Sequence, residues 1–126
     1  MNFINLFFYI YLILFTYNCT QYSPSISKNN RQVVKSYYNN GNIEYQSSYL
    51  NDKLDGPTYY YSKSNYLISY TEYKQGYFNG KSILYYKNGN IKLKSLYKDG
   101  HLHGQENYYY KNGNLKLRNI YDFGVK

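Results

Sequence analysis

Apolar and polar side chains alternate along short runs of this chain, and the runs return every 24 residues. Residues 91–97 read Ile-Lys-Leu-Lys-Ser-Leu-Tyr. Successive side chains of a β-strand point to opposite faces, so this run predicts a strand with one apolar, tyrosine-rich face and one basic face. Residues 43–49 and 115–121 follow the same pattern, but Ile68 and Tyr70 put apolar side chains on the nominally polar face of the second unit. No segment has the helical period of about 3.6 residues, so the predicted fold class is all-β.

Three columns of identical residues mark the repeat. They are a tyrosine column of Tyr49, Tyr73, Tyr97 and Tyr121, a glycine column of Gly56, Gly80 and Gly104, and a second tyrosine column of Tyr37, Tyr61, Tyr85 and Tyr109. Self-similarity at a fixed period is typical of stacked units that bury their apolar surface only against their neighbours. The repeat therefore predicts a stack of supersecondary units, each of which depends on its neighbours for stability.

Turn signals divide each unit into two strands. One turn per unit carries Asn-Gly, ending at Gly41, Gly89 and Gly113, and the second unit has Ser64-Asn65 in its place. We expect type I′ hairpin turns there, because Asn and Gly tolerate positive φ, and Asn65 still permits the left-handed conformation. The other turns fall at residues 51–52, 75–76, 99–100 and 123–124. The sequence thus predicts successive β-hairpins.

The repeat resembles a known family. Residues 85–92, Tyr-Tyr-Lys-Asn-Gly-Asn-Ile-Lys, and residues 97–104, Tyr-Lys-Asp-Gly-His-Leu-His-Gly, are similar to the bacterial variant of the MORN repeat. The resemblance covers residues 37–126 as three full units and a partial fourth. It implies an elongated, curved single-layer antiparallel sheet that serves as a scaffold, dimerisation surface or membrane-proximal module. Several bacterial relatives are described as antitoxins, so an antitoxin-like inhibitor of a toxin partner is an alternative function.

The first residues predict export. Residues 1–18 carry no charged side chain and contain an unbroken apolar run from Leu6 to Phe15, which is the length of a signal-peptide core rather than of a membrane span. With Cys19 at its end and a polar tether over residues 19–36, the segment resembles a bacterial lipoprotein signal, which implies lipidation of Cys19 and attachment to a membrane of the cell envelope. An ordinary cleaved signal, giving a secreted or periplasmic protein, and an uncleaved anchor are the alternatives. The single cysteine excludes an intramolecular disulfide.

Charge suggests a second binding mode. The formal net charge is +8, and basic residues gather in the last two units. We expect Lys92, Lys94, Lys116 and Arg118 to share a face that contacts anionic lipid or glycan surfaces, with a merely solvated face as the alternative. Export argues against nucleic acid as the partner.

The sequence offers no catalytic constellation. His101 and His103 lack further metal ligands, and Glu44, Glu72 and Glu106 occupy different positions in the unit, so no enzyme, cofactor or metal site is predicted. The remaining hypothesis is a module that binds a protein, or a second copy of itself through sheet edges. Because binding sites break symmetry, the irregular second unit with Tyr66, Ile68 and Tyr70 is the candidate contact region.

Overall fold

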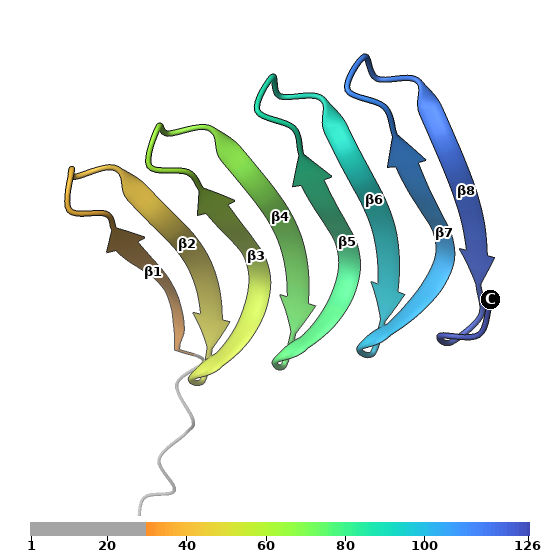
Figure 1. Ribbon diagram of the computed structural model, residues 1–126. Helices are drawn as coiled ribbons and strands as arrows, with labels where there is room; N and C mark the ends of the chain where they lie inside the picture. Colours follow the sequence, from red (N-terminus) through yellow and green to blue (C-terminus); the bar gives the residue numbers. More distant parts are fainter. Residues whose placement is uncertain (1–29) are drawn as a thin grey trace, which may run out of the picture.

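The computed structural model describes residues 30–126, which form one eight-stranded antiparallel sheet with the strands in sequence order (Figure 1). The strands are β1 (Arg31–Tyr37), β2 (Ile43–Leu50), β3 (Lys53–Tyr61), β4 (Leu67–Lys74), β5 (Tyr77–Tyr85), β6 (Ile91–Lys98), β7 (His101–Tyr109) and β8 (Leu115–Tyr121). The all-β prediction, a single open sheet of successive hairpins, is confirmed. The predicted signal, Cys19 and the first part of the tether lie outside the described residues.

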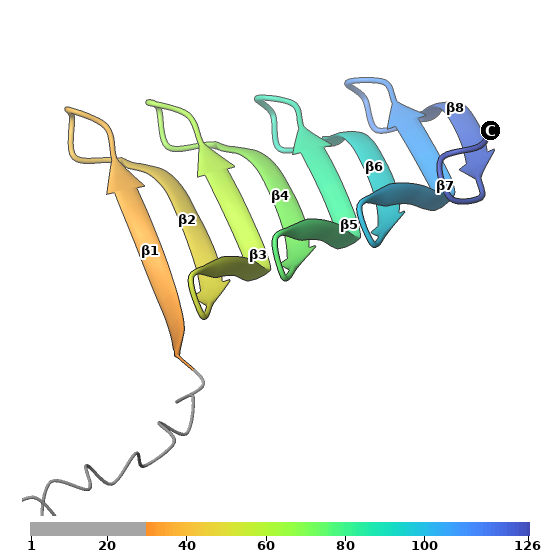
Figure 2. The same cartoon turned by 90° about the horizontal axis from the view of Figure 1, so that it is seen from below.

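The sheet begins earlier than predicted. The sequence predicts a polar tether up to residue 36, but residues 31–36 belong to β1 and pair with β2 from Arg31 opposite Leu50 onward. The sequence of β1, Arg-Gln-Val-Val-Lys-Ser-Tyr, alternates less regularly than the later strands, which explains why the pattern did not identify it. Figure 2 shows that β1 is the edge strand at one end of the sheet, opposite β8 at the other end, and continues the same curved sheet.

The sheet has a single layer. Each strand lies beside its neighbours in sequence, and no helix or second sheet covers either face within residues 30–126 (Figures 1 and 2). As a result no apolar side chain in this part of the chain is buried, whereas small polar residues such as Ser47, Thr58 and Ser95 are 2 to 3% exposed. Small side chains in the middle of the strands are covered by the larger side chains on both sides of them.

Two kinds of turn connect the strands, and the prediction of turn type was wrong. In the Asn-Gly loops the backbone N–H of Gly41 donates to the carbonyl of Tyr38 at 2.9 Å, and only Gly41, not Asn40, has positive φ. This is a type I turn followed by a left-handed residue, which gives a longer hairpin loop than type I′. Asn65 takes the left-handed position in the second unit with φ 63°, as predicted.

The type I′ turns lie at the opposite ends of the strands. Asn51 and Asp52 both have positive φ, as do Gln75 and Gly76, Asp99 and Gly100, and Phe123 and Gly124. Lys74 pairs directly with Tyr77, and Lys98 with His101, so each of these turns has two central residues. The turns whose sequence varies from unit to unit are therefore the shorter ones, and the Asn-Gly loops are the longer ones.

A β-bulge beside each long loop changes the predicted faces. Leu84 pairs with Leu93, but Tyr85 pairs with Ile91, so Lys92 is an extra residue. Because paired residues point to the same face and neighbours to opposite faces, Ile91 and Leu93 lie on different faces. The sequence predicted that they share one. The same shift occurs at Glu44, Ile68 and Lys116.

The register defines two faces, which we call face A and face B. From β2 to β8, face A carries Tyr45, Ser47, Tyr49, Leu54, Thr58, Tyr60, Ser69, Thr71, Tyr73, Phe78, Ser82, Leu84, Leu93, Ser95, Tyr97, Leu102, Glu106, Tyr108, Leu117, Asn119 and Tyr121. Face B carries Tyr59, Tyr61, Tyr70, Glu72, Lys81, Ile83, Tyr85, Lys94, Asn107, Arg118 and Ile120. The tyrosine column of Tyr49, Tyr73, Tyr97 and Tyr121 lies on face A, and the column of Tyr61, Tyr85 and Tyr109 on face B.

Hydrogen bonds join the long loops of successive hairpins in pairs. The Tyr38 hydroxyl donates to the carbonyl of Tyr61 at 2.8 Å, and the side-chain amides of Asn40 and Asn42 donate to the carbonyl of Lys63 at 2.9 and 2.8 Å. Tyr86, Asn88 and Asn90 make the equivalent bonds to the fourth loop at 2.9, 3.0 and 2.9 Å. We call this set the loop clasp.

The loop clasp is missing between the second and third hairpins. Ser62, Ser64 and Tyr66 stand where the other loops have Tyr, Asn and Asn, and the Ser62 hydroxyl instead accepts bonds from its own loop at 3.2 Å. In contrast the type I′ turns are joined at every step, by Gly76 N–H to Leu54 O, Gly100 N–H to Phe78 O and Gly124 N–H to Leu102 O. The irregular unit therefore weakens one end of one hairpin junction.

Restoring the clasp should stabilise the sheet. We expect Ser64→Asn with Tyr66→Asn to supply two donors for the carbonyl of Lys87 and to raise the free energy of unfolding in urea by about 1 to 2 kcal/mol. The reverse change, Asn88→Ser with Asn90→Ser, should lower it by a similar amount because it removes two bonds of 3.0 and 2.9 Å. Equal stability of all three proteins would contradict the role of the clasp.

Gly80 should be the least replaceable glycine of its column. Its φ is 109°, and a Cβ there would lie 2.0 Å from Oε2 of Glu72, which accepts a hydrogen bond from the Lys81 N–H at 2.6 Å. Gly80→Ala should therefore cost about 2 kcal/mol or more of unfolding free energy in urea. Gly41→Ala is the matched control, since its φ is 84° but nothing lies within 4 Å of the added Cβ. A smaller cost at Gly80 than at Gly41 would refute this account.

Candidate functional site

Charge is divided between the two faces. Lys81, Lys94 and Arg118 lie on face B, and none of the paired residues assigned to face A from β2 to β8 is a lysine or arginine. Glu106 is the one charged residue among them; the bulge residue Glu44 lies beside face A, where its carboxylate accepts a bond from Ser36, the partner of Tyr45, at 3.1 Å. A chain with a formal net charge of +8 thus places a carboxylate within the aromatic rows of face A. This contrast makes the surroundings of Glu106 the candidate functional site.

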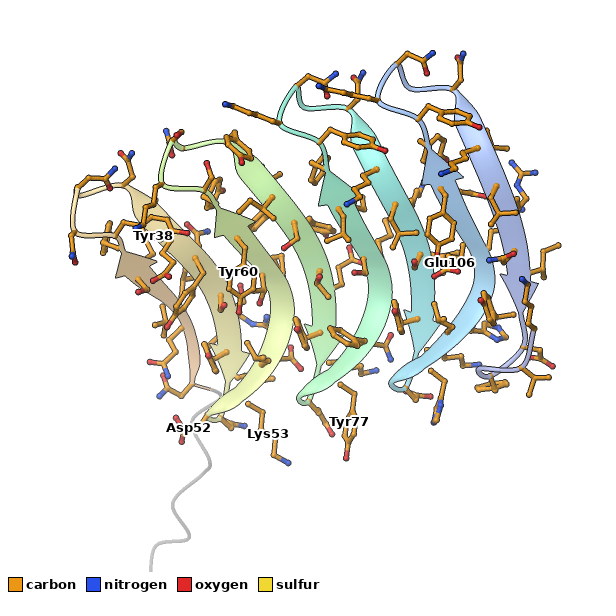
Figure 3. All side chains as sticks on the ribbon, in the orientation of Figure 1. Tyr38, Asp52, Lys53, Tyr60, Tyr77 and Glu106 are labelled. Carbon is orange, nitrogen blue, oxygen red and sulfur yellow. The ribbon has the colours of Figure 1, made fainter. Side chains whose placement is uncertain are left out.

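Glu106 lies in the middle of β7 and is 6% exposed. Figure 3 shows it at mid-height between β6 and β7. The Ser95 hydroxyl donates to Oε1 at 3.4 Å from β6, and the Asn119 amide donates to Oε2 at 3.3 Å from β8. Both bonds are long, since hydrogen bonds to a carboxylate are commonly about 2.7 to 2.9 Å. Within residues 30–126 Glu106 forms no ion pair; those present join Arg31 to Asp55 and His103 to Asp122.

Three tyrosines surround the carboxylate. Burial, the negative charge of Glu106 and a hydrogen bond to its carboxylate raise the pKa of Tyr108. The same causes raise the pKa of Tyr121, partly offset by a hydrogen bond with Asn119, and burial followed by the charge of Glu106 raises the pKa of Tyr97. Each phenol therefore stays protonated and neutral around a carboxylate. We call Glu106, Tyr97, Tyr108 and Tyr121 the Glu106 cluster.

The first two hairpins repeat this geometry without the charge. Thr58 is the repeat equivalent of Glu106, and Tyr49, Tyr60 and Tyr73 are the equivalents of the three tyrosines. The Thr58 side chain is 2% exposed, and its hydroxyl has no hydrogen-bond partner. Burial, and then the proximity of Tyr60 and Tyr49, raise the pKa of Tyr73. In the third unit Ser82 is the equivalent residue, but Leu84 replaces one tyrosine.

Face B carries a different polar cluster. The Tyr70 hydroxyl donates to Oε1 of Glu72 at 2.5 Å, and the Tyr59 ring packs on Tyr70 with 5.2 Å between ring centroids. The hydrogen bond to Glu72, then burial and the carboxylate charge, raise the pKa of Tyr70 to about 12. Glu72 is the side chain that fills the space left by Gly80. This cluster stabilises the junction of β4 and β5, where the loop clasp is missing.

The structure separates the predicted basic residues into two kinds. Lys94 and Arg118 lie in one row of face B on either side of Asn107, whose Oδ1 accepts a bond from Arg118 Nε at 3.0 Å. Lys92 and Lys116 are bulge residues, with Nζ 6.0 Å from the Tyr86 ring centroid and 5.5 Å from that of Tyr110. These distances place each ammonium beside a tyrosine of its own long loop.

The predicted irregular unit is not one surface. Tyr70 belongs to the face B cluster, Ile68 is a bulge residue that is 38% exposed, and Tyr66 lies in the long loop. Their role in partner binding stays a prediction. The repeat glycines have structural positions: Gly41, Gly89 and Gly113 are the left-handed residues of the long loops, and the glycine column lies where β3, β5 and β7 shift register against the preceding strand.

The other polar groups of the sheet are weaker candidates for a functional site. His103 Nδ1 lies 3.3 Å from Asp122 Oδ1, and its ring contacts Phe123 at 4.7 Å between centroids, which ties the last turn to β7. Residues 30–126 contain no group of three or more possible metal ligands. Shallow hollows of about 430 and 380 Å³ lie at opposite strand ends, one lined by Tyr37, Tyr38 and Lys63 among others and one by Lys74, Tyr77 and Asp99. Neither includes the Glu106 cluster.

The Glu106 cluster was not predicted from the sequence. Glu44, Glu72 and Glu106 occupy different positions in the unit, so their spacing indicates no carboxylate pair and draws no attention to Glu106. The signal was the column Thr58, Ser82 and Glu106, in which a carboxylate replaces a small hydroxyl. Pairing across β6, β7 and β8 was needed to identify its neighbours.

Comparison with known proteins supports the repeat. A family model described as MORN repeat variant matches residues 33–51, 78–99 and 102–122. The matched segments leave out the second long loop, in which the clasp residues are replaced. No curated protein matches the chain significantly. Within the described part of the chain, no helix is long and apolar enough to cross a membrane.

The Tyr70–Glu72 bond should control alkaline stability. Because the pKa of Tyr70 is raised from 10.0 to about 12, its contribution to stability is complete below about pH 10 and is lost as the pH rises through about 12. We expect Glu72→Gln to move the pKa of Tyr70 back toward 10, as measured by NMR titration of the labelled phenol carbon. Glu44→Gln is the control, since Glu44 bonds Ser36 instead at 3.1 Å. A Tyr70 pKa that stays near 12 in Glu72→Gln would exclude Glu72 as the cause.

Proposed function

Because this chain belongs to the MORN repeat family, in its variant form, we propose that it is a non-catalytic interaction module that binds a protein partner through face A. MORN repeats are commonly interaction or binding modules, and that general role applies to this chain. The choice of a protein partner and of face A is the further step, and it rests on the composition of the two faces.

The observation that carries the proposal is the uncovered aromatic surface of face A. Its tyrosines, with Phe78 and several leucines, lie on a sheet that has no second layer within residues 30–126. Aromatic residues are enriched and lysines depleted at the centres of protein interfaces, because large rings bury much apolar surface at little entropic cost. The paired residues of face A have this composition, whereas face B combines its tyrosines with Lys81, Lys94 and Arg118.

The module is proposed to act at the cell envelope. Cys19 would carry the lipid, and the residues between it and β1 would tether the sheet to the membrane surface. Fractionation of cells, with mass spectrometry of Cys19, tests this part separately. An acylated Cys19 in the membrane fraction supports it, and an unmodified protein in the cytosol favours the antitoxin-like alternative.

Face B supports a second candidate function, binding to anionic lipid or glycan surfaces. Lys94 and Arg118 lie in one row, and Lys92 and Lys116 lie at the loop ends of the same strands. Charge reversal of these four residues should abolish binding of the purified sheet to anionic vesicles, because the attraction is electrostatic. Binding that survives the charge reversal would reject this candidate.

Two residues of β8 provide a matched test of face A. Leu117 lies on face A and is 49% exposed, and Ile120 lies on face B and is 66% exposed. We expect Leu117→Arg to abolish capture of the envelope partner by the purified protein and Ile120→Arg to leave it unchanged. Both side chains are exposed, so circular dichroism and unfolding in urea should show folded variants. Loss of capture with Ile120→Arg alone would refute the assignment to face A.

A further inference from the structure

We propose that the Glu106 cluster is a recognition site for the ammonium group of a lysine side chain on the protein partner. This inference rests on the proposed function, since it requires that a partner approach face A. It adds the chemistry of one contact: a carboxylate at the base, and the rings and hydroxyls of Tyr97, Tyr108 and Tyr121 around it.

The first argument is that the carboxylate lacks a counter-charge. A buried carboxylate is costly unless hydrogen bonds or an opposite charge compensate the lost hydration. Glu106 is 6% exposed, and its bonds from Ser95 and Asn119 measure 3.4 and 3.3 Å. Tyr108 and Tyr121 are also hydrogen-bonded to the carboxylate, but all of these donors are neutral. Among residues 30–126 no lysine or arginine forms an ion pair with Glu106, since the ion pairs present are Arg31–Asp55 and His103–Asp122. A cation supplied from outside would complete the compensation.

The second argument is the character of the surrounding rings. Aromatic faces attract cations, and clusters of rings beside a carboxylate are suited to ammonium groups. Tyr97, Tyr108 and Tyr121 come from three adjacent strands and are each half-buried, so their surfaces remain partly open to a ligand above the sheet. Their neutral phenols, whose pKa values are raised, add no competing negative charge.

The third argument distinguishes lysine from arginine. A guanidinium binds a carboxylate best through two parallel bonds, one to each oxygen. Oε1 of Glu106 already accepts a bond from Ser95 and Oε2 one from Asn119. Tyr108 and Tyr121 are hydrogen-bonded to the carboxylate as well, so the two parallel bonds of a guanidinium would have to displace several donors. A compact ammonium needs only one lone pair of the carboxylate, so a lysine side chain fits this site better than an arginine.

The repeat supplies an internal control. Thr58 lies among Tyr49, Tyr60 and Tyr73 in the same register in which Glu106 lies among its three tyrosines. The site around Thr58 has the rings without the charge. A difference between the two sites therefore reports on the carboxylate rather than on tyrosine content or on the fold.

The test measures binding of Nα-acetyl-lysine methylamide to the purified protein by NMR, with Nα-acetyl-norleucine methylamide as the neutral probe. We expect saturable, weak binding of the lysine probe with shifts confined to Tyr97, Tyr108 and Tyr121, and at least tenfold weaker binding of the norleucine probe. Glu106→Ser should abolish the lysine response. Serine already occupies the equivalent position at Ser82, so this variant is compatible with the repeat.

A gain of function completes the test. Thr58→Glu should create a second lysine site, seen as new shifts of Tyr49, Tyr60 and Tyr73. Should that variant fail to fold, the Glu106→Ser comparison still decides the question. Equal binding of the lysine and norleucine probes, or lysine binding that persists in Glu106→Ser, would overturn the proposal. So would a Glu106-dependent response to phosphatidylethanolamine vesicles without one to the lysine probe, because the ammonium would then come from lipid.

This failure can be separated from failure of the proposed function. If Leu117→Arg abolishes partner capture but the lysine probe does not bind, face A is the interface and the lysine contact is rejected. If neither Leu117→Arg nor Glu106→Ser affects capture, the assignment of the partner to face A is itself wrong. If both variants weaken capture and the lysine probe binds at Glu106, both proposals are supported.

Discussion

The single sheet layer is the constraint on which the rest of the structure depends. Without a second layer, the sheet can bury side chains only against neighbours on the same face, and within residues 30–126 no apolar side chain becomes buried. The residues that do become buried are polar and, apart from Glu106, small, and all but Ser62 lie within strands. Aromatic rings beside them contact one another along the array, as Tyr73, Phe78 and Tyr97 do with 5.0 Å between successive centroids. Stability therefore comes from repeated cross-strand contacts and backbone hydrogen bonds.

This constraint also explains how the array can carry a binding surface. A globular domain would bury its aromatic residues in a core, whereas a single layer leaves both faces available. Basic residues then distinguish the faces: face B combines tyrosines with Lys81, Lys94 and Arg118, whereas the paired residues of face A include no lysine or arginine and carry Glu106 among tyrosines. Glu106 departs from the small residues found at Thr58 and Ser82, so its desolvation is a cost that simple maintenance of the repeat does not require.

Much of the fold could be predicted from the sequence because the repeat determines it locally. The period, the hairpins and the left-handed Asn65 follow from residue types at fixed spacing. The bulges did not, since a run such as Ile91 to Tyr97 reads as perfect alternation and only the pairing of Tyr85 with Ile91 reveals the extra Lys92. The turn types could not be predicted for a related reason. Asn-Gly is compatible both with a type I′ turn and with a type I turn followed by a left-handed glycine, and the number of residues between the last paired residues of the two strands decides between them.

The central claim is that face A is free in the isolated protein and becomes covered by the partner. Solvent paramagnetic relaxation of the methyl groups of Leu117 and Ile120, which are 49 and 66% exposed on opposite faces of β8, tests it directly. We predict strong relaxation of both methyl groups in the free protein and selective protection of Leu117 when the partner binds. Protection of Leu117 in the free protein, or of Ile120 rather than Leu117 in the complex, would contradict the account.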